Sequence, residues 1–374
     1  MPREETLSSA GTFGGAIQRP KAQQKRLLIA ASGTGGHLFP ALAVAEQLSD
    51  YQIEWLGVPD RLETRLVPAQ YPLHTIAVEG FQKQLGLGSF VIFSRLVRAI
   101  VQVRRLLQQG QFSSVFTTGG YIAAPAIIAG RSLGLPTVLH ESNALPGKVT
   151  RWLSPWCSSV ALGFDAAAQQ LPKARSIYVG TPVRSEFWQP AKLELDIPAE
   201  VRLVVVAGGS QGAVAINRLV RQCALTWLNE GIWVVHLTGD NDPEVSELIH
   251  PHYLPLPFYH NMAALLQRAD LAISRAGAGT LTELAATGTP AILIPFPYAA
   301  EDHQTYNANV FVSAGAAKIF SQASLTPELL GAEALDLLRS PQVLSNMSQQ
   351  ASNLAVPDST VQLAQLVRQM VESR

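Results

Sequence analysis

The segment 270–304 contains the chain's densest group of residues suited to binding or catalysis. Apolar residues at 271–274 predict a buried strand, Gly277 and Gly279 follow in a loop, and a helix is predicted over 280–287. The first turn of a helix presents unpaired backbone N–H groups at the positive end of the helix dipole. The loop is therefore predicted to bind an anion such as a phosphate.

Four polar residues surround this predicted anion site. Glu283 lies one turn into the helix, where its carboxylate oxygens can accept hydrogen bonds from a vicinal diol such as a ribose. Arg275, His303 and Gln304 flank the same helix start. A nucleotide sugar would use all of these groups, although the helix dipole alone also favours a glutamate in the first turn.

A second glycine turn, GTGGH at 33–37, follows the apolar strand predicted to begin at Arg26 and opens an amphipathic helix. A dinucleotide fingerprint would need its third glycine where the chain has Leu38, so a site for NAD or FAD is disfavoured. His37 lies at the helix start, where an imidazole can act as a general base. A single histidine is, however, more often a capping or core residue.

The order of strand, glycine turn and helix recurs along the chain. The turns at 31–37 and 207–213 look equivalent, which predicts an α/β fold of two Rossmann-like domains with parallel sheets facing each other across a cleft. HESN at 140–143 directly follows another apolar strand, so these polar residues are predicted to point into that cleft. Asn143 can donate and accept hydrogen bonds to a sugar, although turn capping also explains the cluster.

Composition excludes several other classes of protein. The 374 residues suffice for two domains, and 28 Lys plus Arg balance 28 Asp plus Glu, so no nucleic-acid partner is indicated. The two cysteines lack CxxC spacing, which disfavours a thiolate metal site. The DND sequence at 240–242 imitates a metal-binding DxD motif, but Asp and Asn are ordinary turn formers, so no metal is predicted. Residues 1–25 are polar and lack a secretory signal, and a disordered extension is predicted there.

The segment 81–107 combines large apolar residues with cationic ones. Arg95, Arg98 and Arg105 fall on one face of the predicted helix, and Phe93 lies elsewhere on it. One interpretation is a core helix with a solvated basic side. The other is that the segment touches an anionic membrane surface.

Five motifs in fixed order carry a family resemblance. They are GTGGH at 33–37, HESN at 140–143, GTPVR at 180–184, GGSQGA at 208–213, and the stretch from RAGAGTLTE to DHQ at 275–304. Each motif alone is weak, but the set over residues 26–374 resembles the MurG family. These bacterial enzymes add N-acetylglucosamine to a lipid-linked muramyl peptide at the cytoplasmic face of the inner membrane, where they are peripheral.

The resemblance implies a glycosyltransferase of the GT-B type, acting in peptidoglycan synthesis without cofactor or metal. Its donor would be UDP-N-acetylglucosamine and its acceptor an undecaprenyl-pyrophosphoryl-muramyl peptide. An acceptor and membrane-side domain would comprise 26–183 plus 357–374, and a donor domain 184–356. Rival interpretations are another GT-B enzyme, such as a UDP-N-acetylglucosamine 2-epimerase, and a non-catalytic scaffold that retains a nucleotide pocket.

Functional residues follow from the matched motifs. The positions that match substrate contacts of the family are Thr34, Gly35, Gly36, Asn143, Arg184, Ser210, Tyr259, Ala278, Gly279, Thr280, Leu281, Thr282, Glu283 and Gln304. Arg184 and Ser210 match diphosphate contacts, and the backbone at Tyr259 matches uracil recognition. The implied reaction is an inverting displacement, in which Arg184 stabilises the departing diphosphate and His37 is the candidate base. His140 and Glu141 also border the cleft and remain alternative bases.

Overall fold

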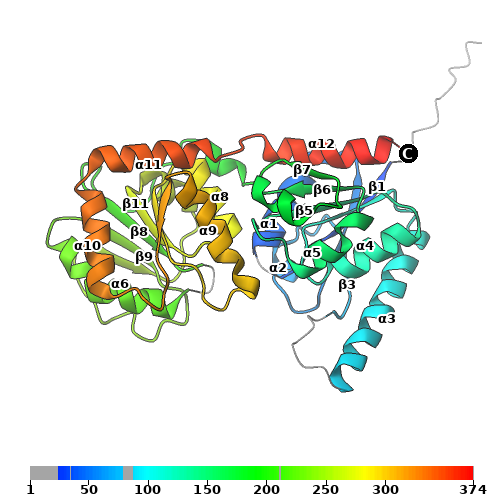
Figure 1. The fold of residues 1–374 in the computed structure, drawn as a ribbon, viewed down its shortest axis with the longest axis horizontal. Helices are drawn as coiled ribbons and strands as arrows, with labels where there is room; N and C mark the ends of the chain where they lie inside the picture. The colour runs from blue at the N-terminus through cyan, green and yellow to red at the C-terminus, as the bar shows by residue number, and fades with distance from the viewer. Residues whose placement is uncertain (1–23, 34, 79–86, 210–211, 374) are drawn as a thin grey trace, which may run out of the picture.

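The computed structural model describes residues 24–33, 35–78, 87–209 and 212–373, with the side chains of 87–91 excluded. Residues 1–23 of the predicted extension, and the loop that precedes the cationic helix, lie outside these ranges. The described residues form two parallel sheets, each covered by helices on both faces, which lie side by side (Figure 1). The predicted class, two Rossmann-like domains, is confirmed.

The first sheet has seven strands in the order β3-β2-β1-β4-β5-β6-β7, all paired in parallel. Its strands are β1 (Arg26–Ala30), β2 (Gln52–Gly57), β3 (Leu73–Thr75), β4 (Ser114–Thr117), β5 (Thr137–Glu141), β6 (Ser159–Leu162) and β7 (Ser176–Tyr178). Its helices are α1 (Gly35–Gln47), α2 (Glu63–Leu66), α3 (Leu87–Gln109), α4 (Ala123–Ser132) and α5 (Lys148–Leu153). Alternation along β1 fills both faces: Leu27 and Ile29 pack beneath α1, whereas Leu28 packs beneath α3 and α4.

The second sheet has six strands in the order β10-β9-β8-β11-β12-β13, also all parallel. Its strands are β8 (Leu203–Ala207), β9 (Trp233–Leu237), β10 (Tyr253–Leu256), β11 (Leu271–Ser274), β12 (Ala291–Leu293) and β13 (Ala317–Ile319). Its helices are α6 (Val214–Leu228), α7 (Met262–Arg268), α8 (Ala278–Thr287), α9 (His303–Ser313), α10 (Pro327–Leu338) and α11 (Pro341–Asn353). Strands buried on both faces explain the nearly continuous apolar runs such as 203–206.

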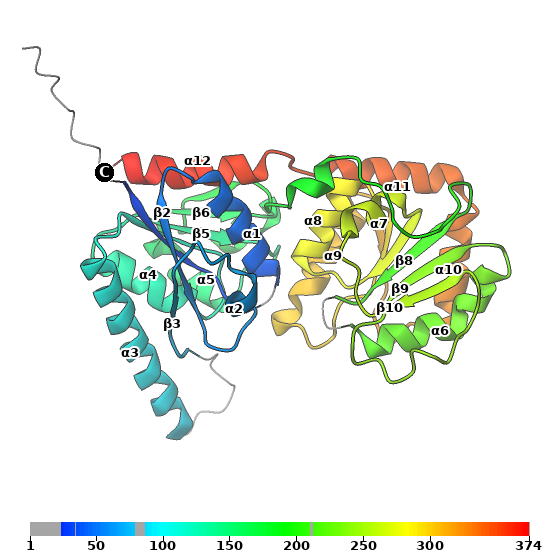
Figure 2. The same ribbon diagram turned by 180° about the vertical axis from the view of Figure 1, so that it is seen from behind.

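The last helix, α12 (Ser359–Glu372), returns to the first sheet. It runs beside α1 along one edge of the molecule, and the view from behind in Figure 2 shows the same arrangement. Leu363 and Val367 complete the apolar cluster that contains Leu38, and Arg368 pairs with Asp50 at 2.7 Å. Helix α12 therefore packs on the first lobe.

The chain crosses between the lobes twice, and the two crossings touch. Gly180 has a φ of +74°, and a Cβ at this position would lie 2.6 Å from Cβ of Val356. The Ser359 hydroxyl donates to the Thr181 carbonyl at 3.2 Å. The predicted domain boundaries at 183–184 and 356–357 fall in these crossings, and we keep them as a proposal.

Candidate active site

Two helix starts face each other between the lobes. Helix α1 follows β1 and α8 follows β11, so both begin at the carboxyl ends of parallel strands. The approach is close, because a Cβ added to Gly279 would lie 3.9 Å from Cα of Gly36. Both helix dipoles therefore direct their positive ends into the same cleft.

Helix α8 begins two residues earlier than predicted, because Gly277 takes an extended conformation and acts as the N-cap. The Leu281 amide donates to the Gly277 carbonyl at 3.0 Å, closing the first helical turn. The amides of Ala278, Gly279 and Thr280 precede that bond and belong to the N-terminal groups that have no partner within the helix. These three amides lie where the glycine spacing predicts an anion site, and that site remains a prediction.

Glu283 lies one turn into α8 and is half-buried, with 23% of its side chain exposed. Burial raises the pKa of Glu283 to about 7, while the nearby Arg184 guanidinium acts in the opposite direction. An Arg184 Nη atom lies 3.6 Å from a Glu283 carboxylate oxygen. A carboxylate with the chemistry to accept from a diol and a guanidinium with the chemistry to pair with a diphosphate thus lie together at one helix start.

Arg184 contacts both lobes. Its guanidinium also pairs with Glu186 at 2.8 Å and lies 5.1 Å from the ring centroids of both Phe39 and Phe187. Phe39 belongs to α1 in the first lobe, whereas Phe187 follows the crossing. Aromatic faces favour a cation at this distance, so the two rings hold the guanidinium at the lobe boundary.

His37 has one ring nitrogen bonded to the backbone and the other available. Its Nδ1 lies 2.7 Å from the Thr118 carbonyl oxygen, and because a carbonyl only accepts, Nδ1 carries the proton in the neutral ring. Nε2 then has a free lone pair for accepting a proton. A Cβ added to Gly120, whose φ is +73°, would lie 3.8 Å from Nε2, and one added to Gly119, whose φ is +90°, would lie 3.7 Å from the neighbouring Cε1.

The two alternative bases have structural partners. His140 is fully buried, its Nε2 lies 3.2 Å from the Gly180 carbonyl, and burial lowers its pKa to about 4. Glu141 is also buried and accepts from the Thr150 hydroxyl at 2.7 Å and from two backbone amides of its own loop. These bonds leave His37 as the candidate whose basic atom is available.

Asn143 and Gln304 come from opposite lobes. The Asn143 side-chain amide donates to Glu141 at 3.1 Å. Gln304 Oε1 accepts from the amides of Phe296 at 2.8 Å and Ala276 at 3.3 Å, so its Nε2 group is the end of the amide that can donate elsewhere. The predicted sugar contacts therefore flank the cleft formed by the helix starts.

The remaining predicted contacts have different environments. Leu281 is fully buried in the core of the second lobe, so its side chain does not face the cleft. The partly buried Thr282 side chain donates its hydroxyl to the Ala278 carbonyl of the same helix at 2.7 Å. The Tyr259 hydroxyl accepts from the Glu194 amide at 3.4 Å, which anchors the side chain, and the predicted contact at this residue concerns its backbone only. Thr34 and Ser210 lie outside the described residues.

Arg275 does not have the expected place beside the helix start. Its guanidinium is buried and donates to the carbonyls of Ile294 and Pro295 at 3.0 Å and to Gln322 at 2.6 Å. Burial lowers its pKa to about 10. Arg275 therefore ties β11 to the loop after β12, a role that an arginine next to a glycine loop does not reveal in sequence.

No group of three or more His, Cys, Asp or Glu side chains is arranged to hold a metal ion among the residues that the structure describes. Asp242 of the DND sequence is buried and bonds to Arg221 at 2.6 Å and to Asn217 at 2.8 Å. The acidic residue at the end of this motif thus stabilises the loop after β9, as the turn interpretation requires.

Two residues of the cleft were missed by sequence reasoning. Asn307 on α9 is fully buried and bonds to both Asn143 and Ala144 of the opposite lobe. Its signal was its position three residues after Gln304, which places both on one helix face. Phe39 gave no signal, because an apolar residue in the first turn of a helix normally predicts core packing.

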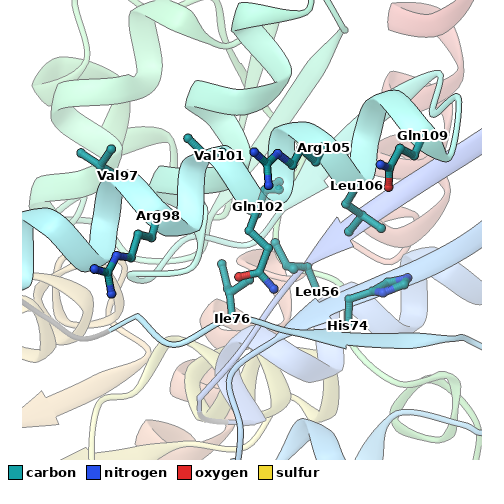
Figure 3. A pocket seen from close by; sticks show the side chains of 11 residues that line it. Leu56, His74, Ile76, Val97, Arg98, Val101, Gln102, Arg105, Leu106 and Gln109 are labelled. Carbon is teal, nitrogen blue, oxygen red and sulfur yellow. The ribbon is translucent and has the colours of Figure 1, made fainter.

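A second concave surface lies on the first lobe, away from the cleft. It is a groove of about 610 Å³ between α3 and the segment around β3. Figure 3 shows Val97, Arg98, Val101 and Arg105 on α3, with His74 of β3 on the other side. The groove therefore combines apolar walls with two arginines.

The chain is similar to known glycosyltransferases over almost its whole length. The N-terminal domain of glycosyltransferase family 28 matches residues 27–162, and the C-terminal domain of that family matches 203–363. A Nostoc punctiforme protein named UDP-N-acetylglucosamine--N-acetylmuramyl-(pentapeptide) pyrophosphoryl-undecaprenol N-acetylglucosamine transferase is 65% identical over 351 residues, which cover 93% of this chain and 98% of that protein. The crystal structure of Acinetobacter baumannii MurG superposes with a TM-score of 0.77 at 33% identity, covering 92% of this chain and 99% of that one.

The chain belongs to the MurG family. A Synechocystis relative of the same name is 60% identical and covers 93% of this chain and 98% of its own length. A putative UDP-N-acetylglucosamine 2-epimerase from Listeria monocytogenes shares only 14% identity at a TM-score of 0.67, covering 94% of this chain and 98% of that one. This second likeness shows the fold alone, whereas the MurG family membership rests on sequence and fold together.

Proposed function

We propose that this chain transfers N-acetylglucosamine from UDP-N-acetylglucosamine to the 4-hydroxyl of the lipid-linked N-acetylmuramyl pentapeptide, converting lipid I to lipid II in peptidoglycan synthesis. The observation that carries the proposal is the meeting of two helix starts, one with His37 and the other with Glu283. Membership of the MurG family supplies the identities of donor and acceptor.

For the donor, we assign the diphosphate to the amides of Ala278 to Thr280 and to Arg184. Glu283 accepts from the ribose hydroxyls, and the backbone at Tyr259 contacts the uracil. Asn143 and Gln304 donate to the sugar from opposite sides of the cleft. Thr34, Gly35, Gly36 and Ser210 complete the proposed contacts on the glycine loops.

In the proposed reaction, His37 Nε2 removes the proton of the acceptor 4-hydroxyl as its oxygen attacks the anomeric carbon. The bond from that carbon to the phosphate oxygen breaks, and its electron pair remains on the diphosphate. Negative charge therefore grows where the α8 amides and Arg184 point. One preorganised hydrogen-bond donor of this kind lowers the activation free energy by about 3 kcal/mol.

We further propose that the first lobe binds an anionic membrane surface through α3. The described residues contain no helix that is both long and apolar enough to cross a bilayer. On α3, Phe93, Val97 and Val101 form an exposed apolar stripe at a spacing of four residues, contrary to a simple core helix. Arg98 and Arg105 border this stripe and line the groove in Figure 3, as an interfacial helix requires.

Vesicle binding tests the membrane proposal. The Arg98→Glu and Arg105→Glu double variant replaces two cationic charges by anionic ones. Each arginine near an anionic surface contributes about 1 kcal/mol to the free energy of membrane binding, so the variant should bind anionic vesicles at least tenfold more weakly at low salt. Its transfer activity on a soluble acceptor analogue should match the parent enzyme, because both residues lie away from the cleft. Equal vesicle binding by the variant and the parent would contradict the proposal.

A transfer assay tests the proposed reaction. Labelled UDP-N-acetylglucosamine is incubated with the chain in the presence and absence of lipid-linked muramyl pentapeptide, and both lipid and nucleotide products are separated. The expected result is label in the lipid fraction and stoichiometric UDP, only when the acceptor is present. An epimerised nucleotide sugar formed without acceptor would instead support the 2-epimerase interpretation.

A further inference from the structure

Asn307 joins the two lobes at the edge of the proposed sugar site. Its Oδ1 accepts from the Ala144 amide of the first lobe at 2.8 Å. Its Nδ2 donates to Asn143 Oδ1 at 3.1 Å and to the Ala276 carbonyl at 3.2 Å. A backbone amide only donates and a backbone carbonyl only accepts, so these partners fix which end of the Asn307 amide is which.

The fixed Asn307 amide in turn orients Asn143. Asn143 Nδ2 donates to the Glu141 carboxylate at 3.1 Å, and Asn143 Oδ1 faces the Asn307 donor. Each end of the Asn143 amide is therefore set by a different lobe. When the lobes separate, the bond from Asn307 is lost and only the Glu141 half of this constraint remains.

The second predicted sugar contact, Gln304, is bonded to the same residue as Asn307, namely Ala276. Gln304 lies one turn before Asn307 on α9, and its Oε1 accepts from the Ala276 amide at 3.3 Å, while Asn307 binds the Ala276 carbonyl. Asn307 is fully buried, so water cannot replace a lost partner without opening the site. One side chain thus links both sugar-contact residues to the contact between the lobes.

The start of α9 has a second attachment to the first lobe. Glu301 and Asp302 have φ values of +53° and +58°, a left-handed conformation that is unfavourable for residues with a side chain. Arg151 of the first lobe pairs with Glu301 at 2.5 Å, and the Thr305 hydroxyl donates to Asp302 at 2.7 Å. These bonds hold the turn that aims α9 at the cleft.

We infer that Asn307 is a positioning residue that completes the sugar site only when the two lobes are in contact. It acts through Asn143 and Gln304, with the Arg151–Glu301 pair supporting the same helix start. The inference rests on the proposed function, because it assigns these residues to the donor sugar. It predicts that loss of Asn307 impairs recognition of the sugar while recognition of the nucleotide, which depends on α8 and Glu283, is preserved.

The Asn307→Asp variant tests the inference with minimal change of shape. The carboxylate still accepts from Ala144 but has no donor for Asn143 or Ala276. We expect kcat/KM with UDP-N-acetylglucosamine to fall by about tenfold to a hundredfold, with preference over the 4-epimer UDP-N-acetylgalactosamine reduced, and the Kd for UDP within about twofold of the parent. Asn309→Asp is the matched control, since it adds the same charge at an exposed position of the same helix.

A second variant pair keeps the inference testable if Asn307→Asp does not fold. Arg151→Glu opposes Glu301 and should lower sugar preference severalfold, and adding Glu301→Arg should restore it. The inference is overturned if the parent enzyme transfers and Asn307→Asp has the same sugar preference as the parent. If Asn307→Asp does not fold, an unchanged sugar preference in Arg151→Glu overturns it instead. Absence of transfer by the parent enzyme would instead contradict the proposed function.

Discussion

The proposed contact of Glu283 with the ribose predicts a pH dependence of donor binding whose size can be calculated. Burial raises the pKa of Glu283 to about 7, and the ionised carboxylate offers one charged oxygen to each ribose hydroxyl, whereas protonation converts one of these oxygens into a donor and weakens the pair. At pH 6 about one tenth of the carboxyl is ionised, and at pH 8 about nine tenths. The Kd for UDP-N-acetylglucosamine is therefore expected to decrease about tenfold between pH 6 and pH 8.

The same shift affects stability in the opposite direction. Between the ordinary pKa of 4.5 and about 7, the unfolded chain releases the Glu283 proton while the folded protein keeps it. The free energy of unfolding should thus decrease as pH rises through this window, by about 3 kcal/mol. Replacement of Glu283 by Gln, which resembles the protonated form, should remove this loss and make the variant more stable than the parent at pH 8.

Calorimetry of the parent and Glu283→Gln at pH 6, 7 and 8, with UDP-N-acetylglucosamine and no acceptor, measures the binding effect. The donor diphosphate is esterified at both ends and does not titrate in this range, so the protein supplies the pH dependence. We expect weaker, pH-independent binding by the variant. A parent Kd that is equal at pH 6 and 8, or an equal pH slope in both proteins, would refute the assignment of Glu283 to the ribose.

Three further substitutions have defined outcomes. His37→Ala should lower kcat by about a hundredfold to ten-thousandfold with the donor Kd unchanged, and an unchanged rate and pH profile would exclude His37 as the base. Arg184→Ala should reduce turnover about a hundredfold or more in a steady-state assay, and full turnover would remove Arg184 from the mechanism. Gly180→Ala should lower the free energy of unfolding by about 3 kcal/mol, because a Cβ there meets Val356 at 2.6 Å at a positive φ. Gly231→Ala is the control, because Gly231 has a φ of +77° and an added Cβ there would meet no atom within 4 Å, so its loss of unfolding free energy comes from backbone strain alone. An equal loss of unfolding free energy in both variants would disprove the clash with Val356.

The fold class could be predicted because it depends on local patterns. The apolar run at 27–31 followed by the glycine turn at 33–37 specifies a strand that enters a helix, and the equivalent turn at 207–213 indicates a second domain. The polar residues at helix starts, such as Glu283, could be predicted from the sequence for the same reason. Spacing along one element fixes their relative positions before any tertiary contact is known.

Contacts between the lobes could not be predicted, because they join residues far apart in the chain. Asn307 and Asn143 meet only after both lobes fold and approach, and no local pattern gives that distance. Arg275 was misplaced for a related reason: its partners are carbonyls beyond the next strand, so its direction depends on sheet order. The exposure of Phe93 follows from which face of α3 packs on α4, which periodicity alone does not determine.

The most direct measurement is a crystal structure of this chain with UDP-N-acetylglucosamine bound. The account predicts the ribose hydroxyls on Glu283, the diphosphate at the amides of Ala278 to Thr280 beside Arg184, and the sugar between Asn143 and Gln304. Nucleotide density elsewhere, with Glu283 still paired to Arg184 at the empty start of α8, would contradict it.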